Sequence, residues 1–161
     1  MNTERILKML YSNRELIQRN TREAIEDLHT LKRDYAAVTD EEVLLNFEFN
    51  SSLCEMVFHS AHQKSIEISL KALAQYPDTP HHTILSWHYW LIGHNHAILG
   101  NHSEATGYLE KAIALNENDD STVAKIIQSD SYHTLAMNNE LGKLGSEKSM
   151  KKKKKGLAIL P

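Results

Sequence analysis

An internal repeat constrains the fold of this chain more than any other feature of its sequence. Four segments share a polar or basic pair, then a small residue, then an apolar residue four positions further on. The second and fourth segments depart from this pattern, because Ser69 and Lys153 occupy the apolar position. The small residues lie 41, 40 and 44 positions apart, at Ala24, Ser65, Ala105 and Ser149. A repeat of roughly 40 residues holds one helical hairpin. We therefore expect an all-α chain of stacked hairpins.

Hydrophobic spacing assigns two helices to each repeat. Apolar residues recur at three- and four-residue spacing after the small residue, as in Ile66, Leu70 and Leu73, which is typical of a short amphipathic helix. Thr39 and Glu42 predict a capping box at the start of the second hairpin. The longer first helices are expected at about 3–18, 40–58, 80–99 and 121–142. The four hairpins of this single domain are predicted over residues 1–37, 39–77, 79–117 and 120–161.

The third hairpin has small and aromatic residues at regular positions. They are Tyr89, Ile92, Gly93, Leu99, Gly100, Ala105, Leu109 and Ala112. This pattern resembles the tetratricopeptide repeat, although His96 and Glu117 stand where that family has an aromatic residue and a proline. The resemblance implies a right-handed α-α superhelix, a TPR-like solenoid of about four helical hairpins. In such a hairpin Gly93 faces Ala105, because a larger side chain would push the two helices apart.

The second helix predicted for the last repeat is unusual because it contains the lysine run Lys151–Lys155. One interpretation is a solvated helix end, with the lysines near the negative end of the helix dipole. The other is an electrostatic contact with an acidic partner, a membrane surface or nucleic acid, although no aromatic residue interleaves with the lysines to stack bases. Since the chain ends at Pro161, where a repeat would end, we also expect it to be a regulatory fragment of a longer protein.

Composition narrows the function classes. The chain has 161 residues, a net charge of −3 and a single cysteine, Cys54, so it can form neither an internal disulfide nor a zinc knuckle. No apolar run approaches the ~18 residues of a membrane span, and the N-terminus lacks the apolar stretch of a secretory signal. We expect a cytoplasmic protein with no membrane span and no specific affinity for nucleic acid.

Six histidines suggest metal binding because they fall within 22 residues, at His81, His82, His88, His94, His96 and His102. None of the six has a second histidine at the i+4 spacing of a helical metal site. Cys54 lies in the middle of a predicted helix, without the strand–turn–helix setting of an exposed nucleophile. The sequence therefore predicts no enzyme, no cofactor and no metal site, and a histidine-rich metal-binding protein is kept as an alternative.

Binding is the function that stacked hairpins favour, because their first helices line one concave face. The family register places an exposed stripe on that face at Phe47, Asn50, Cys54, Trp87, Trp90, His94, Thr134, Leu135 and Asn138. Tryptophans are common interface anchors, and asparagines can hold the backbone of an extended peptide. Core packing is the alternative for Phe47, Trp87 and Trp90. Because this stripe has no lysine or arginine, we expect a neutral or partly apolar ligand.

The predicted function is that of a protein–protein interaction module. Repeats of this length resemble those in the N-terminal regions of bacterial signalling proteins, which implies a regulatory or sensor domain that binds a peptide or protein segment. A regulator that senses a small peptide or another ligand is the main alternative. The partner and the oligomeric state are left open, with a homo-oligomer as one possibility.

Overall fold

A computed structural model describes residues 2–159 of the protein, except the side chains of Ser149, Lys152, Lys153 and residues 155–159. This part of the chain forms seven helices and no strand, which confirms the expected all-α class. The helices are α1 (Thr3–Arg19), α2 (Thr21–Asp34), α3 (Glu41–His59), α4 (His62–Gln75), α5 (His82–Ile98), α6 (His102–Ala114) and α7 (Thr122–Ile159). No helix within the described residues is long and apolar enough to cross a membrane.

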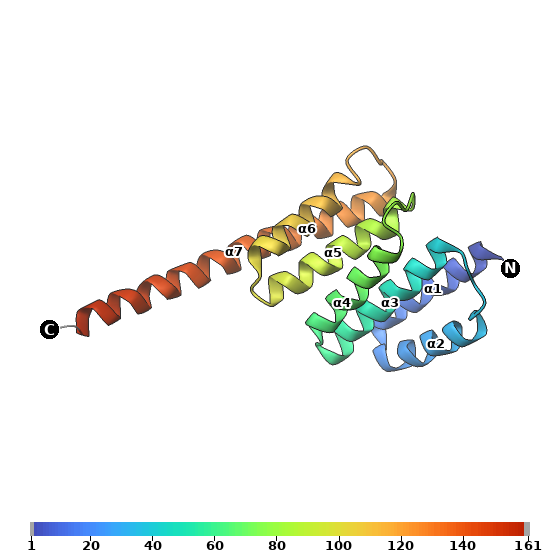
Figure 1. Cartoon of the computed structure of the whole chain (residues 1–161), viewed down its shortest axis with the longest axis horizontal. Coiled ribbons are helices and arrows are strands. Elements are labelled where there is room, and N and C mark those ends of the chain that lie inside the picture. Colours follow the sequence, from blue (N-terminus) through green and yellow to red (C-terminus); the bar gives the residue numbers. More distant parts are fainter. Residues whose placement is uncertain (1, 160–161) are drawn as a thin grey trace.

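The helices pack in two layers (Figure 1). Helices α1, α3, α5 and α7 form one layer, in which each contacts the next. The second layer consists of α2, α4 and α6, each of which contacts the helix before it and the helix after it in the chain. The pairs α1–α2, α3–α4 and α5–α6 correspond to the first three predicted hairpins.

Local sequence explains where the helices begin and end. The side chain of Asn20, the residue between α1 and α2, accepts a hydrogen bond from the backbone N–H of Glu23. Asp40, rather than the predicted Thr39, caps α3 by accepting from the backbone N–H of Val43 at 3.1 Å. Gly100 takes a φ of 82° just after α5, a left-handed conformation that favours glycine at a helix end.

The small residues of the repeat lie where helices approach closely. Ala24, Ser65 and Ala105 are all fully buried. At Gly93 of α5, a Cβ atom would lie 2.7 Å from Cγ of Leu109 and 3.2 Å from the carbonyl oxygen of Ala105. The expected contact between Gly93 and the Ala105 turn of α6 is therefore present, and side-chain volume at position 93 sets the spacing of α5 and α6.

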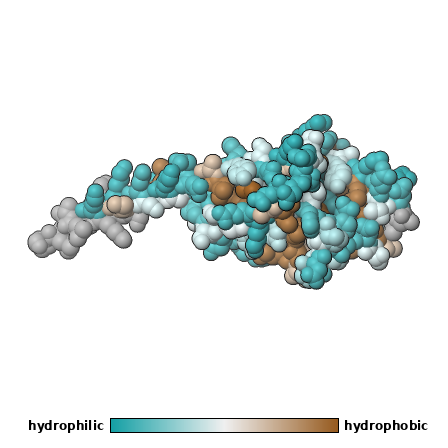
Figure 2. All heavy atoms as spheres, turned by 90° about the horizontal axis from the view of Figure 1, so that it is seen from above, coloured by the Kyte–Doolittle hydropathy of each residue, from teal (hydrophilic) through white to brown (hydrophobic). Residues whose placement is uncertain are grey.

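The prediction of a fourth hairpin over 120–161 is wrong, because α7 is one continuous helix. Gly142 and Gly145 lie inside this helix, where a glycine costs only about 1 kcal/mol. The buried residues of α7 end at Asn138, and those from Lys143 to Lys148 are exposed. The helix projects away from the other six (Figure 1), and its projecting part is mostly hydrophilic (Figure 2). Ser149, Pro161 and three lysines of the predicted second helix lie outside the described side chains.

A chain of buried polar groups runs through the centre of the protein. The imidazole of His88 is fully buried, with Nε2 3.0 Å from the carbonyl oxygen of Leu45 and Nδ1 3.0 Å from Oγ of Ser69. Burial lowers the pKa of His88 to about 4, so the ring is neutral and Nε2 donates to the carbonyl. From Ser69 the hydrogen bonds continue through Ser52, Ser65, Asn95 and His62. This network joins α3, α4 and α5.

Candidate functional site

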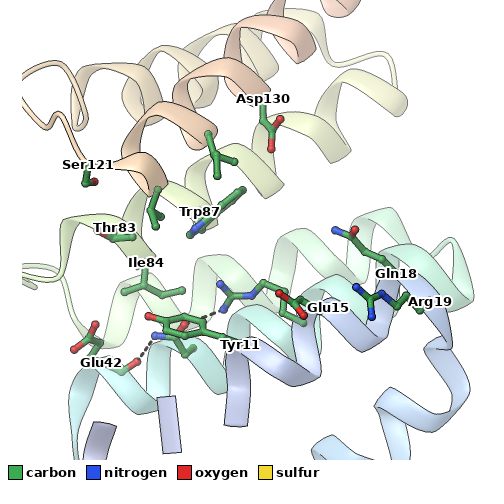
Figure 3. Close-up of a pocket in the computed structure, with 14 residues that line it drawn as sticks. Tyr11, Glu15, Gln18, Arg19, Glu42, Thr83, Ile84, Trp87, Ser121 and Asp130 are labelled. Atoms are coloured by element: carbon green, nitrogen blue, oxygen red, sulfur yellow. Dashed lines mark hydrogen bonds between the residues drawn. The ribbon is translucent and has the colours of Figure 1, made fainter. Parts of the chain in front are cut away.

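A groove of about 780 Å³ crosses the layer of odd-numbered helices. Helix α1 forms one wall, α5 and α7 form the other, and α3 lies between them (Figure 3). Within the described residues α1 and α7 do not contact each other, so the groove separates the first helix from the last. Its lining residues are Tyr11, Arg14, Glu15, Gln18, Arg19, Glu42, Asn46, Thr83, Ile84, Trp87, Ser121, Val123, Ile126 and Asp130.

Apolar side chains on opposite walls face this groove while remaining accessible to water. Tyr11 of α1 is 44% exposed, and Val123 and Ile126 of α7 are 44% and 47% exposed. Trp87 of α5 is partly buried between them, with its ring 5.6 Å from that of Trp90. Exposed apolar surface that is gathered in a concavity is typical of an interaction site.

The guanidinium of Arg14 lies at the junction between α1 and α3. Its Nη2 donates to Oδ1 of Asn46 at 2.8 Å, and its Nε donates to Oδ1 of Asn50 at 3.0 Å. The ring of Phe49 lies beneath it, 4.4 Å from the guanidinium carbon. Burial lowers the pKa of Arg14 to about 10, so the side chain still carries its positive charge at neutral pH.

The two asparagines that hold Arg14 are themselves fixed by the backbone. Nδ2 of Asn46 donates to the carbonyl oxygen of Glu42 at 2.8 Å, and Nδ2 of Asn50 donates to that of Leu10 at 2.9 Å. Both side chains are buried. Arg14 is therefore presented to the groove in one orientation.

Trp87 is the only one of the predicted site residues that lines this groove. Phe47 and Cys54 are packed in the core, and Asn50 accepts a hydrogen bond from Arg14. Burial raises the pKa of the Cys54 thiol to about 11. The expectation that Phe47, Asn50 and Cys54 form an exposed stripe is thus not met, because the middle of α3 is buried in a helix that packs against α1, α2, α4 and α5.

The second half of the predicted stripe is covered by contacts between α5 and α7. Nε1 of Trp90 donates to Oγ1 of Thr134 at 3.2 Å, and the ring of His94 lies 5.5 Å from that of Trp90. Thr134 and Asn138 are buried. The Asn138 side chain is occupied by His102, whose Nδ1 lies 2.7 Å from Asn138 Oδ1. Leu135 is partly buried and does not line the groove.

Sequence reasoning missed the contribution of α1 to the site. Tyr11, Arg14 and Gln18 are spaced by three and four positions, which places them on one helix face, and this spacing could have identified them. The expectation of a groove without basic residues is wrong, since Arg14 and Arg19 both line it. The polar residue Asn13 is accommodated inside α1 because its buried side chain donates to the carbonyl oxygen of Ala24.

The histidines are distributed over different contacts rather than gathered in one site. His88 lies in the core, His62 and His102 each contact a buried asparagine, and His96 stacks on Tyr108. Within the described residues, no three side chains of the metal-ligating types are placed to hold one ion.

Comparison with protein-family models, curated proteins and solved structures identifies no relative from which a function could be transferred. The resemblance to the tetratricopeptide repeat and the assignment to signalling proteins therefore remain predictions from sequence. No protein-family model, no curated protein and no solved structure matches this chain.

Proposed function

We propose that the protein is a binding module whose groove takes a segment of another polypeptide. The observation that carries this proposal is the pairing of half-exposed apolar side chains on facing walls, Tyr11 on α1 with Val123 and Ile126 on α7. A polypeptide suits such a groove because its side chains cover the apolar walls while its backbone contacts exposed polar groups such as Thr83 and Gln18.

The hydrogen bonding and ionisation of the polar groups near the groove support a binding role rather than a catalytic one. Asn46, Asn50 and Arg14 are held by one another and by backbone carbonyls, which builds a fixed recognition surface. The thiol of Cys54 is buried and its pKa is raised, so it is not an activated nucleophile.

A sensor role is the second candidate, and the position of the groove favours it. The groove separates α1 from α7, whose described residues do not contact each other, and α7 projects from the rest of the protein. A ligand that contacts both walls would favour one relative position of these helices, and α7 could pass that change to an attached output domain. This proposal includes two expectations from the sequence. The protein resembles regulatory regions of bacterial signalling proteins, and it is expected to act in the cytoplasm.

Selection of peptides tests the binding role. Purified protein is used to select binders from a phage-displayed library of random linear peptides, and the selected peptides are measured by fluorescence anisotropy. We expect Ile126→Glu to abolish binding, because it places a charge on an apolar wall. Phe58→Glu is the matched control, since Phe58 is 50% exposed and lies outside the groove. Failure to select any binder, or equal affinity for the two variants, would refute the proposal.

Thermal denaturation tests the sensor role with the same peptides. A ligand that bridges α1 and α7 should raise the melting temperature and also change the distance between probes on these two helices. A rise in melting temperature without a change in that distance would leave binding in place and exclude the sensor role.

A further inference from the structure

The charge of this chain is divided unequally between residues 1–140, the body, and residues 141–161, the basic segment. The body contains eleven lysines and arginines against twenty aspartates and glutamates, which gives a net charge of −9. The basic segment contains seven lysines and one glutamate, which gives a net charge of +6. The overall charge of −3 is therefore the sum of an acidic body and a strongly basic end, and none of these seven lysines lines the groove.

The described lysines of the basic segment have few carboxylates near them. Lys143 approaches Glu140 at 3.2 Å, in an exposed pair one helical turn apart. Lys148, Lys151 and Lys154 are exposed, and no carboxylate of a described residue lies within 4.0 Å of their ammonium groups. Their charges are therefore free to attract an anion from outside the chain.

The length of α7 keeps these lysines away from the acidic body. Asn138 is the last described residue of α7 that is buried, and the helix continues to Ile159 as it projects from the other six (Figure 1). At 1.5 Å per residue, Lys151 lies roughly 20 Å beyond Asn138 along the helix axis. Screening at physiological salt acts over about 8 Å, so the carboxylates of the body neutralise the lysines only weakly. An anionic surface can contact the basic segment without approaching the body.

The residue types favour a broad anionic surface over a site for one anion. All seven cations are lysines, which are compact, strongly hydrated point charges, whereas arginine suits bidentate recognition of a single phosphate or carboxylate. Four lysines recur at three- and four-residue spacing, which places them on one face of the helix. This basic face consists of Lys148, Lys151, Lys152 and Lys155. A row of point charges along a helix matches the headgroups of an anionic lipid layer.

Apolar residues accompany the lysines and favour lipid over nucleic acid. Leu144 and Met150 are 51% and 59% exposed on the projecting part of α7. Leu157, Ile159 and Leu160 follow the lysine run in the sequence. Stable binding of a helix to a membrane surface combines basic residues, which attract the headgroups, with apolar residues, which enter the boundary of the acyl region. Single-stranded nucleic acid is instead bound by aromatic residues near the cations, and the basic segment contains no aromatic residue.

We propose that the basic segment binds the surface of an anionic lipid membrane through its basic face. The contact is peripheral, and it is a second binding surface that is separate from the groove and does not rest on the function proposed for it. The groove lies on the body, so it stays accessible to its polypeptide while the end of α7 holds the protein at the membrane.

Sedimentation with lipid vesicles tests the proposal on the purified full chain without a histidine tag. Vesicles of phosphatidylcholine alone are compared with vesicles of phosphatidylcholine mixed with phosphatidylserine. We expect the protein to sediment only with the mixed vesicles. Raising the salt from about 0.1 M to 1 M should release it, because the screening length falls from about 10 Å to 3 Å. Absence of binding to the mixed vesicles, or equal binding to both kinds, would overturn the proposal.

A pair of charge-matched variants locates the contact. The test variant replaces three lysines of the basic face, with Lys151→Gln, Lys152→Gln and Lys155→Gln. It should weaken binding to the mixed vesicles tenfold or more, since each lysine near an anionic surface adds to the attraction. These positions lie beyond Asn138, so the buried contacts of α7 stay intact. The matched control removes the same charge from exposed positions of the body, with Arg22→Gln, Arg33→Gln and Lys71→Gln. Equal losses in the two variants would show an effect of net charge alone and refute the assignment.

Competition with nucleic acid separates the two kinds of polyanion. A DNA duplex of random sequence is added to the protein bound on mixed vesicles, at the same concentration of phosphate as of phosphatidylserine. We expect the protein to stay on the vesicles, because the duplex offers no apolar layer for the leucines and the isoleucine that follow the lysine run. Transfer of the protein to the duplex would assign the basic segment to nucleic acid and overturn the proposal.

Discussion

Nδ1 of His62, at the start of α4, lies 2.7 Å from Oδ1 of Asn95 in α5. The same contact recurs one repeat later, where Nδ1 of His102, at the start of α6, lies 2.7 Å from Oδ1 of Asn138 in α7. In both cases the asparagine Nδ2 also donates to a hydroxyl of the histidine's own helix, that of Ser65 or Thr106. These pairs join one repeat to the next by hydrogen bonds, so the repeat exists in side-chain contacts as well as in helix order.

Removing such an asparagine should loosen the stack. Asn95→Ala removes the hydrogen bonds to His62 and to Ser65, and we expect a loss of about 1–3 kcal/mol in the free energy of unfolding. Urea denaturation measures it. Asn101→Ala is the control, because Asn101 also contacts a histidine but on the surface, where we expect a change within about 0.5 kcal/mol. Equal losses in the two variants would contradict a joining role for Asn95.

Side-chain volume at position 93 should be limited by α6. Gly93→Val would push against Leu109 and Ala105, and we expect it to reduce the free energy of unfolding by about 1–3 kcal/mol. Gly107→Val makes the same change on the exposed face of α6, where nothing lies within 4 Å, so the small gain in helix propensity should leave stability unchanged or slightly higher. Thermal denaturation of both variants compares them, and a Gly93 variant as stable as the Gly107 variant would be evidence against close packing.

Neutral His88 should make stability depend on pH. Its pKa falls from 6.5 to about 4 in the folded protein, so between these values the unfolded state takes up a proton that the folded state excludes. The free energy of unfolding should therefore be independent of this group above about pH 6.5 and decrease as the pH falls towards 4, by at most ~3 kcal/mol. The ring's ¹H–¹³C NMR signal should keep its neutral position down to about pH 5. A signal that titrates near pH 6.5 would contradict this prediction.

The Cys54 thiol should react slowly in the folded protein. Raising its pKa from 9.0 to about 11 reduces the thiolate fraction roughly a hundredfold at pH 8, and burial blocks access as well. Labelling with a thiol-specific disulfide reagent should therefore be far slower in buffer than in urea. Comparable rates in the two solutions would show that the thiol is exposed and would contradict the packing of Cys54 in the core.

The helical hairpins could be predicted as far as Ile113 because their signals are local. The spacing of small residues located Ala24, Ser65 and Ala105, and all three are buried between helices. The prediction of a second helix in the last repeat failed because the segment after Gly142 has lysines instead of an apolar face. A helix without an apolar face buries no hydrophobic surface by folding back on its neighbour, so the preceding helix simply continues. Gly142 and Gly145 continue the helix, unlike Gly100, whose positive φ follows the end of α5.

The amino-acid sequence by itself determined the helices of the first three hairpins, their repeat length and the tight contact at Gly93, because these depend on residues within one hairpin. Only the tertiary structure decided which residues face the groove. Asn50 and Asn138 lie on the helices that form the inner layer, yet their amides are used by Arg14 and His102, which are about 36 residues away in sequence. Whether a helical residue is buried or exposed depends on the helix packed against it, and that contact is not encoded in the spacing of its own helix.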